Sequence, residues 1–399
     1  MVICEDKKCF GCAACHDICP QQAIEMSDDT GFWRPVVDDH KCVNCGLCKK
    51  VCTSLLDNIK NSVPLRSFPE KCYAAWSKDE ETHFNSASGG IATEIAKKFI
   101  QNGGIVGGVR FNPDRMCAEH VIVRNRDELK CIAKSKYVLS NKTGIYKSFS
   151  KELDKGISAL FIGTGCEVNS LYHYLSTKRI NTEKLYTIDL LCRGGSSSKC
   201  LKEHVNFIRK GKTISDVRFR GGKFDCAFTV WDKNEKLLYK SSQYKDAYFG
   251  LFMKHTLFQR HCYECPFASA ERTGDITLAD FWGLDEKIAE RSQMRGINLV
   301  ILNSDKGKKL FSDIENQLTC YERPLKEAIA GNDTLKEPTE WHEEYDKLWE
   351  SIITEGFIKA IKKVYNIDET RDYLKFKFYT TRYKAKEKLM KLICTNMGG

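Results

Sequence analysis

Residues 9–20 read CFGCAACHDICP, and residues 42–53 repeat the same cysteine spacing in CVNCGLCKKVCT. Both stretches contain the pattern C-x2-C-x2-C-x3-C, followed by Pro20 in the first and by Thr53 in the second. Three cysteines spaced in this way lie on one tight loop and can hold three irons of a cubane, but the fourth iron needs a ligand from elsewhere. The repeat therefore predicts two [4Fe–4S] clusters in a bacterial-type, ferredoxin-like domain over residues 1–55.

The ligands of the two predicted clusters are expected to cross between the motifs, because each fourth ligand comes from the other motif in two-cluster ferredoxins. One set is then Cys9, Cys12, Cys15 and Cys52, and the other is Cys42, Cys45, Cys48 and Cys19. Gly11 and Gly46 lie inside the loops, where a missing side chain lets backbone N–H groups approach the sulfurs. Two zinc sites are the weaker alternative, since structural zinc usually takes pairs of C-x2-C. Cys4 lies outside both motifs and is interpreted as a bystander.

The composition predicts a metal-binding protein of the cytoplasm. The chain has 399 residues and 20 cysteines, no apolar run long enough to span a membrane, and no apolar signal segment before Cys9. Closely spaced cysteines in such a chain indicate metal ligation rather than disulfides. The formal net charge of +10 counts thiolate ligands as neutral, so it supports nucleic-acid binding only weakly, and no nucleic-acid partner is expected. A basic balance fits anionic cofactors such as flavin phosphates, or an acidic redox partner, equally well.

Beyond the cysteine motifs the sequence alternates between strand and helix patterns, which predicts an α+β chain with a mixed α/β body. Residues 56–70 contain Pro64 and Pro69 and are interpreted as a linker. Strands are expected at 23–26 and 33–37 in the head and at 73–76, 105–109, 118–123, 159–162 and 187–191 in the body, with helices at 89–101 and 169–175.

Cysteines follow two of the predicted body strands, at positions where cofactors bind in sheets of this kind. Cys166 and Cys192 occupy these places, and Cys262 and Cys265 form a C-x-x-C pair in a later loop. A single cysteine after a strand is more often a small core residue. The pair favours metal ligation, because two thiols near solvent without a metal are prone to oxidation. Together the four residues provide one ligand set for a third cubane.

The segment FNSASGG, residues 84–90, precedes a predicted helix. Small hydroxyl residues and glycines at such a place expose N–H groups and the positive end of the helix dipole, which suits a phosphate. An ordinary serine-capped helix start is the alternative, and the residues themselves do not decide between the two. If the segment does hold a phosphate, Gly89→Asp is expected to repel it.

The order of several short motifs resembles the coenzyme F420 hydrogenase/dehydrogenase beta-subunit family, which includes the 7-hydroxymethyl chlorophyll a reductases. After the double cysteine motif come SASGG at 86–90, SKYVLS at 135–140, GTGCE at 163–167, DLLCRG at 189–194, CYEC at 262–265 and GDITLADFWG at 274–283. The resemblance covers the chain from Cys9 to about Ile314.

The resemblance implies FAD in the α/β body, with the cluster of Cys166, Cys192, Cys262 and Cys265 beside it. It also implies a family N-terminal region at 71–155 and a C-terminal region at 156–325. Lys136 is then suited to a phosphate contact and Tyr137 to a ring contact. The flavin-binding candidates are Ser86, Ser88, Gly89, Gly90, Ser135, Lys136, Tyr137, Ser140 and Thr164. No catalytic residue is assigned.

The chain departs from common family motifs at three positions. Family members commonly have G-T-P-C-Q and C-H-G, where this chain has Gly165, Glu167 and Arg193 in place of the proline, glutamine and histidine. The cysteines are kept. However, a neutral amide and a titratable ring near the implied flavin have become an acid and a fixed cation.

These features predict an oxidoreductase that passes electrons between the head, the body cluster, FAD and an organic acceptor, either a deazaflavin such as coenzyme F420 or another metabolite. The alternative is an electron-relay subunit that docks on a hydrogenase or reductase and has no substrate of its own. Either function implies a redox partner protein, for example a ferredoxin.

Residues 326–399 are expected to form a helical arm that packs on the body or on a second subunit. Within the arm, residues 373–379 and 382–392 have the spacing of a basic amphipathic helix. Docking of this helix on a membrane surface is the alternative.

Overall fold

The computed structural model describes residues 1–55, 66, 69–220, 226–292 and 296–365. The expected helix at 373–379 and 382–392 and most of the expected linker lie outside these ranges. None of the helices in the described part of the chain combines the length and apolar character that a membrane crossing needs.

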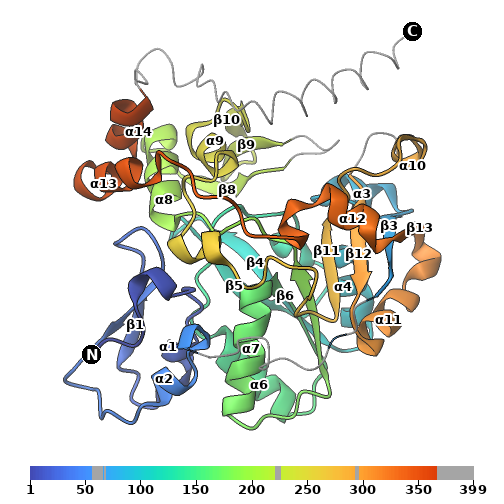
Figure 1. The fold of residues 1–399 in the computed structure, drawn as a ribbon, viewed down its shortest axis with the longest axis horizontal. Helices are drawn as coiled ribbons and strands as arrows, with labels where there is room; N and C mark the ends of the chain where they lie inside the picture. The colour runs from blue at the N-terminus through green and yellow to red at the C-terminus, as the bar shows by residue number, and fades with distance from the viewer. Residues whose placement is uncertain (56–65, 67–68, 221–225, 293–295, 366–399) are drawn as a thin grey trace.

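The head is a small unit in which the two cysteine motifs have the same local structure (Figure 1). Each motif forms a loop that leads into a short helix, α1 (Ala14–Ile18) or α2 (Leu47–Lys50). Gly11 and Gly46 have φ values of +64° and +74°, which glycine adopts without strain. The predicted strands are confirmed as β1 (Ile24–Ser27) and β2 (Arg34–Val37), which pair antiparallel. Short 3-10 turns, η1 (Asp6–Lys8) and η2 (Thr53–Leu55), flank the motifs.

The body contains an eight-stranded mixed sheet in the order β13-β3-β12-β11-β7-β6-β4-β5. The strands are β3 (Lys71–Ser77), β4 (Ile105–Asn112), β5 (Cys117–Val123), β6 (Ala159–Thr164), β7 (Leu185–Leu190), β11 (Ile276–Asp280), β12 (Asn298–Leu302) and β13 (Leu318–Pro324). All five predicted body strands are confirmed, including the antiparallel pair β4–β5. Strands β3, β11, β7, β6 and β4 run in one direction, so their carboxyl ends share one edge, called here the carboxyl edge.

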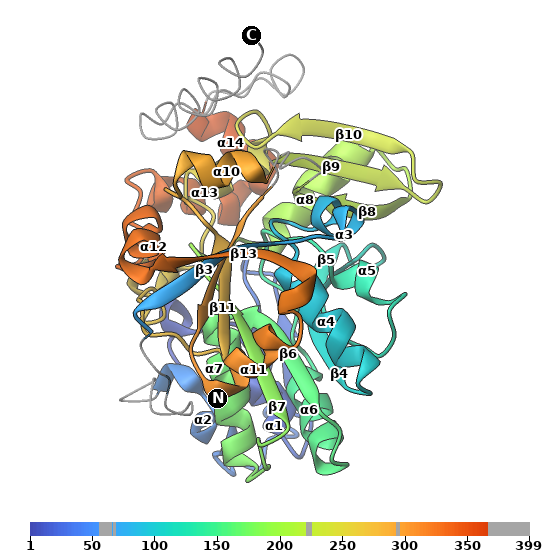
Figure 2. The same cartoon turned by 90° about the vertical axis from the view of Figure 1, so that its right-hand side faces the viewer.

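Helices cover both faces of this sheet. Successive side chains of a strand point to opposite faces, so a strand that is apolar throughout needs a covering layer on each side. Ile105 and Phe161 pack on one face with α6 (Ile145–Asp154) and α7 (Gly165–Thr177). Val106 and Leu160 pack on the other face with α4 (Ile91–Gln101) and α11 (Asp305–Ser312) (Figure 2). The smaller helices are α3 (Glu80–Asn85), α5 (Leu129–Ile132), α10 (Glu286–Arg291), α12 (Leu325–Gly331), η5 (Glu315–Gln317) and η6 (Asp333–Leu335).

The segment of the chain between β7 and β11 forms a second, smaller sheet with its own helices, which the sequence patterns did not reveal. It contains a three-stranded antiparallel sheet of β8 (Ile214–Arg218), β9 (Ala227–Asp232) and β10 (Leu237–Ser242). It also contains α8 (Ser198–Arg209), α9 (Ala247–Met253) and η4 (Arg260–Glu264). Two helices of the expected arm, α13 (Tyr345–Glu355) and α14 (Phe357–Tyr365), bury Leu348 and Phe357 in the same core. The described part of the arm therefore packs on the body.

The head is fixed to the body by polar contacts with buried partners. The side chain of Asp17, fully buried, accepts hydrogen bonds from the backbone N–H groups of Gly144, Tyr146 and Lys147 at 2.6, 3.0 and 3.1 Å. These groups begin α6, where a negative charge is stabilised by the helix dipole. Trp33 Nε1 donates to the Leu139 carbonyl at 3.3 Å, and the hydroxyls of Thr53 and Ser170 are 3.1 Å apart. A helix start in the body thus depends on a head side chain.

We predict that Asp17→Asn lowers the unfolding temperature of the anaerobic protein by several degrees. The amide keeps the shape but removes the charge, and hydrogen bonds to a charged group contribute about 1.5–3 kcal/mol each. Asp29→Asn, at an exposed head position, is the matched control and is expected to stay within about 0.5 kcal/mol of the parent. Equal unfolding temperatures for the two variants would show that the cap contributes nothing.

Candidate metal centres and cofactor site

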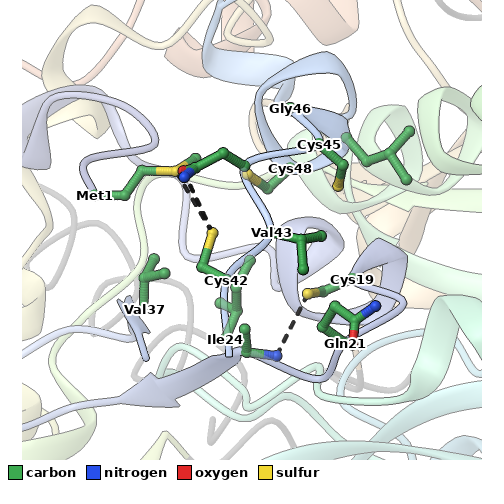
Figure 3. Close-up of a pocket in the computed structure, with 13 residues that line it drawn as sticks. Met1, Cys19, Gln21, Ile24, Val37, Cys42, Val43, Cys45, Gly46 and Cys48 are labelled. Atoms are coloured by element: carbon green, nitrogen blue, oxygen red, sulfur yellow. Dashed lines mark hydrogen bonds between the residues drawn. The ribbon is translucent and has the colours of Figure 1, made fainter. Parts of the chain in front are cut away.

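Two cavities in the head collect the motif cysteines. The cavity shown in Figure 3, called here the outer cavity, is lined by Cys19, Cys42, Cys45 and Cys48. The second, called the inner cavity, is lined by Cys9, Cys12, Cys15 and Cys52, with Cys4 beside them. Each cavity takes three cysteines from one motif and one from the other, and these are the crossed sets that the spacing predicted. Their assignment as ligands remains a prediction.

The sulfurs of both cavities receive backbone hydrogen bonds. Gly11 N–H donates to Cys9 Sγ and Ala23 N–H donates to Cys19 Sγ, both at 3.4 Å. Donors of this kind stabilise the negative charge of a ligated thiolate. Cys45 in the outer cavity is exposed, whereas Cys9, Cys15 and Cys52 in the inner cavity are buried. The outer cavity thus faces solvent, while the inner one lies against the body.

Cys4 does not lie apart from the motifs, as its position in the sequence suggested. It lines the inner cavity beside Cys52 and Cys9, and its thiol interacts with both of theirs. Whether Cys4 is a bystander to metal binding therefore stays a prediction, although its thiol lies among the proposed ligands.

The four predicted body cysteines come together at the carboxyl edge. Cys166 lies in the first turn of α7, Cys192 follows β7, and Cys262 and Cys265 lie in and directly after η4. Burial raises the pKa values of the Cys166 and Cys192 thiols. The charge of Glu167 adds to this effect at Cys166, and the charge of Cys265 adds to it at Cys192, whose pKa rises to about 12. The Cys262 thiol has Cys192 and Cys265 as charged neighbours and accepts the Gly195 N–H at 3.4 Å.

The chemistry of this set fits a metal cluster, because buried thiols close to one another become thiolates only when a cation compensates their charge. In the described residues, no three His, Cys, Asp or Glu side chains are close enough to hold a single metal ion.

Helix α7 connects the inner cavity to the body cysteines. The Cys12 thiol of the inner cavity interacts with the Ser170 side chain, and Ser170 lies one helical turn after Cys166. Residues four apart on a helix are neighbours with Cβ atoms about 5–6 Å apart. A second contact runs through Phe10, which lines the inner cavity and packs edge-on against His261 with ring centroids 4.4 Å apart. His261 directly precedes Cys262, so the two cysteine sets are neighbours.

A buried ion pair holds the start of α7. Glu167 Oε1 lies 3.0 Å from Lys142 Nζ, and Glu167 Oε2 accepts the Thr164 N–H at 2.8 Å to close a capping box. Ser140 belongs to the same network, since its carbonyl accepts from Lys142 Nζ at 2.8 Å and its hydroxyl lies 2.9 Å from His120 Nδ1. Burial alone raises the pKa of Glu167, but the charges of Lys142 and His120 outweigh it and lower the pKa to about 2. Ser140 and Thr164, both flavin candidates, therefore have structural partners.

In segment 84–90, some residues are already committed to contacts within the protein, whereas Ser88 is not. Ser86 Oγ donates back to the Thr82 carbonyl at 2.7 Å, and a Cβ on Gly89 would meet the Ala75 carbonyl oxygen at 2.3 Å. Ser88 Oγ, by contrast, is buried and has no hydrogen-bond partner among the described residues. Gly89 is thus required by close packing on β3, and Gly89→Asp would test the packing rather than a phosphate. Ser88 alone keeps an uncommitted donor, which fits a bound ligand.

In segment 135–140, the contacts of Lys136 differ from the phosphate contact that the resemblance implied. Lys136 Nζ donates to the carbonyls of Cys131, Ala133 and Lys134 at 3.2, 2.5 and 3.4 Å, where it closes the end of α5. Burial lowers the pKa of Lys136 to about 8. The Lys136 ammonium is therefore occupied by the backbone and does not point to a phosphate site. Ser135 is half-buried, and no hydrogen bond to the described residues gives its side chain a role.

An arginine that the motifs did not indicate connects the candidate segments. Arg220 donates to the Tyr137 hydroxyl from Nε at 2.8 Å and to the Ala87 carbonyl from Nη1 at 3.0 Å. Its Nη2 pairs with Asp280 Oδ2 at 2.7 Å, at the end of β11. Segments 84–90 and 135–140 thus meet at the carboxyl edge, beside the body cysteines. The sequence signal that could have shown this is the Arg-Gly-Gly directly after a strand.

The fold and the cysteine sets define an iron–sulfur protein of the oxidoreductase type with a ferredoxin-like head. A family model described as a 4Fe-4S dicluster domain matches residues 8–55. Two further models, the coenzyme F420 hydrogenase/dehydrogenase beta subunit N-term and C terminus, match residues 72–144 and 158–328. The chain belongs to the coenzyme F420 hydrogenase/dehydrogenase beta-subunit family.

The individual relatives share low sequence identity with this chain. The chain is 27% identical over 323 residues to the coenzyme F420-dependent sulfite reductase of Methanocaldococcus jannaschii, a match that covers 77% of this chain and 46% of that protein. The chain therefore spans about half the length of this curated relative. Among solved structures, a chain of the xenon-derivatized F420-reducing [NiFe] hydrogenase complex from Methanosarcina barkeri matches at 17% identity with a TM-score of 0.45, covering 76% of this chain and 93% of that one.

We predict that Glu167→Gln, which restores the residue common in the family motif, destabilises this chain by about 3–5 kcal/mol. The substitution leaves the Lys142 ammonium buried without its partner charge. The double variant Glu167→Gln/Lys142→Met is expected to recover most of the loss, because it removes the unpaired charge. Thermal unfolding of the three anaerobic proteins measures both effects. A double variant less stable than the single one would contradict the assigned ion pair.

Proposed function

We propose that this chain is an iron–sulfur flavoprotein oxidoreductase. Electrons pass between two [4Fe–4S] clusters in the head, a third cluster at the body cysteines and FAD, to or from an organic hydride acceptor. The observation that carries the proposal is the succession of cysteine sets: outer cavity, inner cavity and body set. The inner cavity touches α7 at Ser170, the body set includes Cys166 one turn away, and both lie toward the edge where the flavin candidates meet.

The proposed residue roles follow from these contacts. The crossed sets would hold the two head clusters, and Cys166, Cys192, Cys262 and Cys265 would hold the third. Gly11, Ala23 and Gly195 donate N–H groups to ligand sulfurs, which tunes a bound cluster. When bound, the clusters supply one-electron transfer, and FAD supplies transfer of one or two electrons or of a hydride.

At the flavin site, Ser88 would donate its free hydroxyl to the cofactor. Arg220 donates to both the Ala87 carbonyl and the Tyr137 hydroxyl, and it thereby fixes the loop that carries Ser88 relative to Tyr137. Because Asp280 neutralises Arg220, the guanidinium acts mainly through geometry. Of the other candidates, Ser86, Gly89, Gly90, Ser135, Lys136, Ser140 and Thr164 are proposed to shape the site rather than to bind phosphate directly.

Coenzyme F420 is the acceptor that we propose first. The family description and the name of the curated relative both include it. The sulfite-reducing activity in that relative's name belongs to a protein of which this chain matches less than half, so the proposal does not extend to sulfite.

An electron-relay subunit without a substrate of its own is the second candidate. The observation that favours it is the exposure of the head around the outer cavity. Cys45 is exposed there, and Met1 and Val43, which line the cavity, expose 37% and 61% of their surface. An apolar rim around an accessible cluster site is suited to docking of a redox partner protein.

We predict that the anaerobically purified protein contains about twelve irons per chain, from three cubanes, and reduces coenzyme F420 by itself when given a chemical electron donor. Iron, zinc and flavin analysis and the absorbance of F420 are the measurements. The control variant Cys262→Ala is expected to keep about eight irons and to lose F420 reduction.

The outcomes separate the alternatives. Zinc in place of iron would overturn the proposal. Full cluster content with redox cycling of the centres but no F420 reduction would favour the relay subunit.

We also predict that Ser88→Ala weakens FAD binding roughly fivefold, which corresponds to about 1 kcal/mol for one neutral hydrogen bond. Stability should not fall, because the hydroxyl has no partner to lose. Ser351→Ala is the matched control, since Ser351 Oγ is also buried without a hydrogen-bond partner among the described residues but lies on α13. Flavin titration of the reconstituted proteins measures the change. Equal affinity in both variants would place the flavin away from Ser88.

A further inference from the structure

The inner cavity contains one more cysteine than a cubane needs. Its lining includes Cys4 in addition to the proposed ligands Cys9, Cys12, Cys15 and Cys52. Among the described residues, the cysteines that line the outer cavity are the four of its own set, without a fifth. A [4Fe–4S] cluster takes four thiolates, so the two sites differ in whether a further thiol is within reach.

Cys4 lies next to the place of the crossed ligand. It lines the same cavity as Cys52 and Cys9, and its thiol interacts with both of theirs. Cys52 reaches this place from the end of α2, and Cys4 reaches it from the N-terminal segment. A thiol in the same cavity beside Cys52 can bind the same iron after a small shift of its side chain.

The backbone around Cys4 is held on both sides. Ile3 is 5% exposed and belongs to the core cluster that contains Ile18, Val51 and Cys52. Asp6 Oδ1 lies 2.5 Å from Arg34 Nε on β2. Cys4 therefore sits between two anchored residues, and its place at the cavity is a built feature of the head.

We propose that Cys4 is a reserve ligand for the fourth iron of the inner cluster and replaces Cys52 when that thiolate is lost. The inference rests on the proposed iron–sulfur function. In the exchange, the bond between iron and the Cys52 sulfur breaks and a bond to the Cys4 sulfur forms. The Cys4 proton passes to solvent and the released Cys52 thiolate takes one up, so no electron is transferred.

The test compares Cys52→Ala with Cys19→Ala, its counterpart in the outer cavity, and with Cys4→Ala and Cys4→Ala/Cys52→Ala. Iron content and the electron paramagnetic resonance of the reduced proteins are measured after anaerobic reconstitution. Cys52→Ala and Cys4→Ala are expected to keep the wild-type iron content. Cys19→Ala and the double variant are expected to lose at least one iron per chain.

A second measurement follows the Cys4 thiol itself. Iodoacetamide should alkylate Cys4 in the reconstituted wild type, where it is half-buried and not a ligand, and should leave it unmodified in Cys52→Ala. The body-cluster signal in the electron paramagnetic resonance spectrum must persist in Cys52→Ala, which shows that the variant has folded.

Each outcome decides between the possibilities. If Cys52→Ala loses as much iron as the double variant, or if Cys4 stays reactive in it, Cys4 is not a ligand. If the double variant keeps all its iron, no fourth thiolate is needed and the proposal fails. A wild type that binds no iron would instead overturn the proposed function.

Discussion

The carboxylate of Asp17 is the contact on which the arrangement of the molecule depends most. It is buried at the junction of head and body and satisfies three N–H groups that begin α6. Helix starts are usually capped from their own chain segment, and here the cap comes from 127 residues away. Because α6 packs with α7 on one sheet face, the position of the head and the position of the helix that carries Cys166 are set together. A head that docked otherwise would leave a body helix without its cap.

The carboxyl edge of the sheet provides the other constraint. Parallel strands place their ends at a common edge, so residues far apart in the chain come together without long excursions. Thr164 and Asp280 end β6 and β11, and Cys192 follows β7. Ser88 follows α3 and lies beside the end of β3, where Ser77 N–H donates to the Gly89 carbonyl, so all four residues lie at this edge. The buried pair of Lys142 and Glu167 then fixes the start of α7 beside it. Replacing the common glutamine with glutamate is consistent with the fold because this chain supplies a lysine for it.

Much of the framework could be predicted from local patterns, since spacing and strand endings are local properties. The crossed cysteine sets followed from the motif spacing, and Cys166 and Cys192 followed from strand ends. Local patterns could not show that Gly89 packs against Ala75, because a phosphate-binding glycine and a tightly packed glycine look alike in sequence. They also missed Arg220, which acts through partners 60 to 133 residues away. Nor could they show that the Lys136 ammonium, predicted to contact a phosphate, donates to backbone carbonyls at the end of α5.

The orientation of α7 has a consequence for the direction in which charge moves. Its amino end, which carries about half a positive elementary charge, faces the body cysteines, while Ser170 near the middle of the helix faces the inner cavity. An extra electron is therefore held more favourably at the body set than at the inner set by the field of this helix. With clusters bound as proposed, the dipole of this helix would favour the step from head to body over the return step.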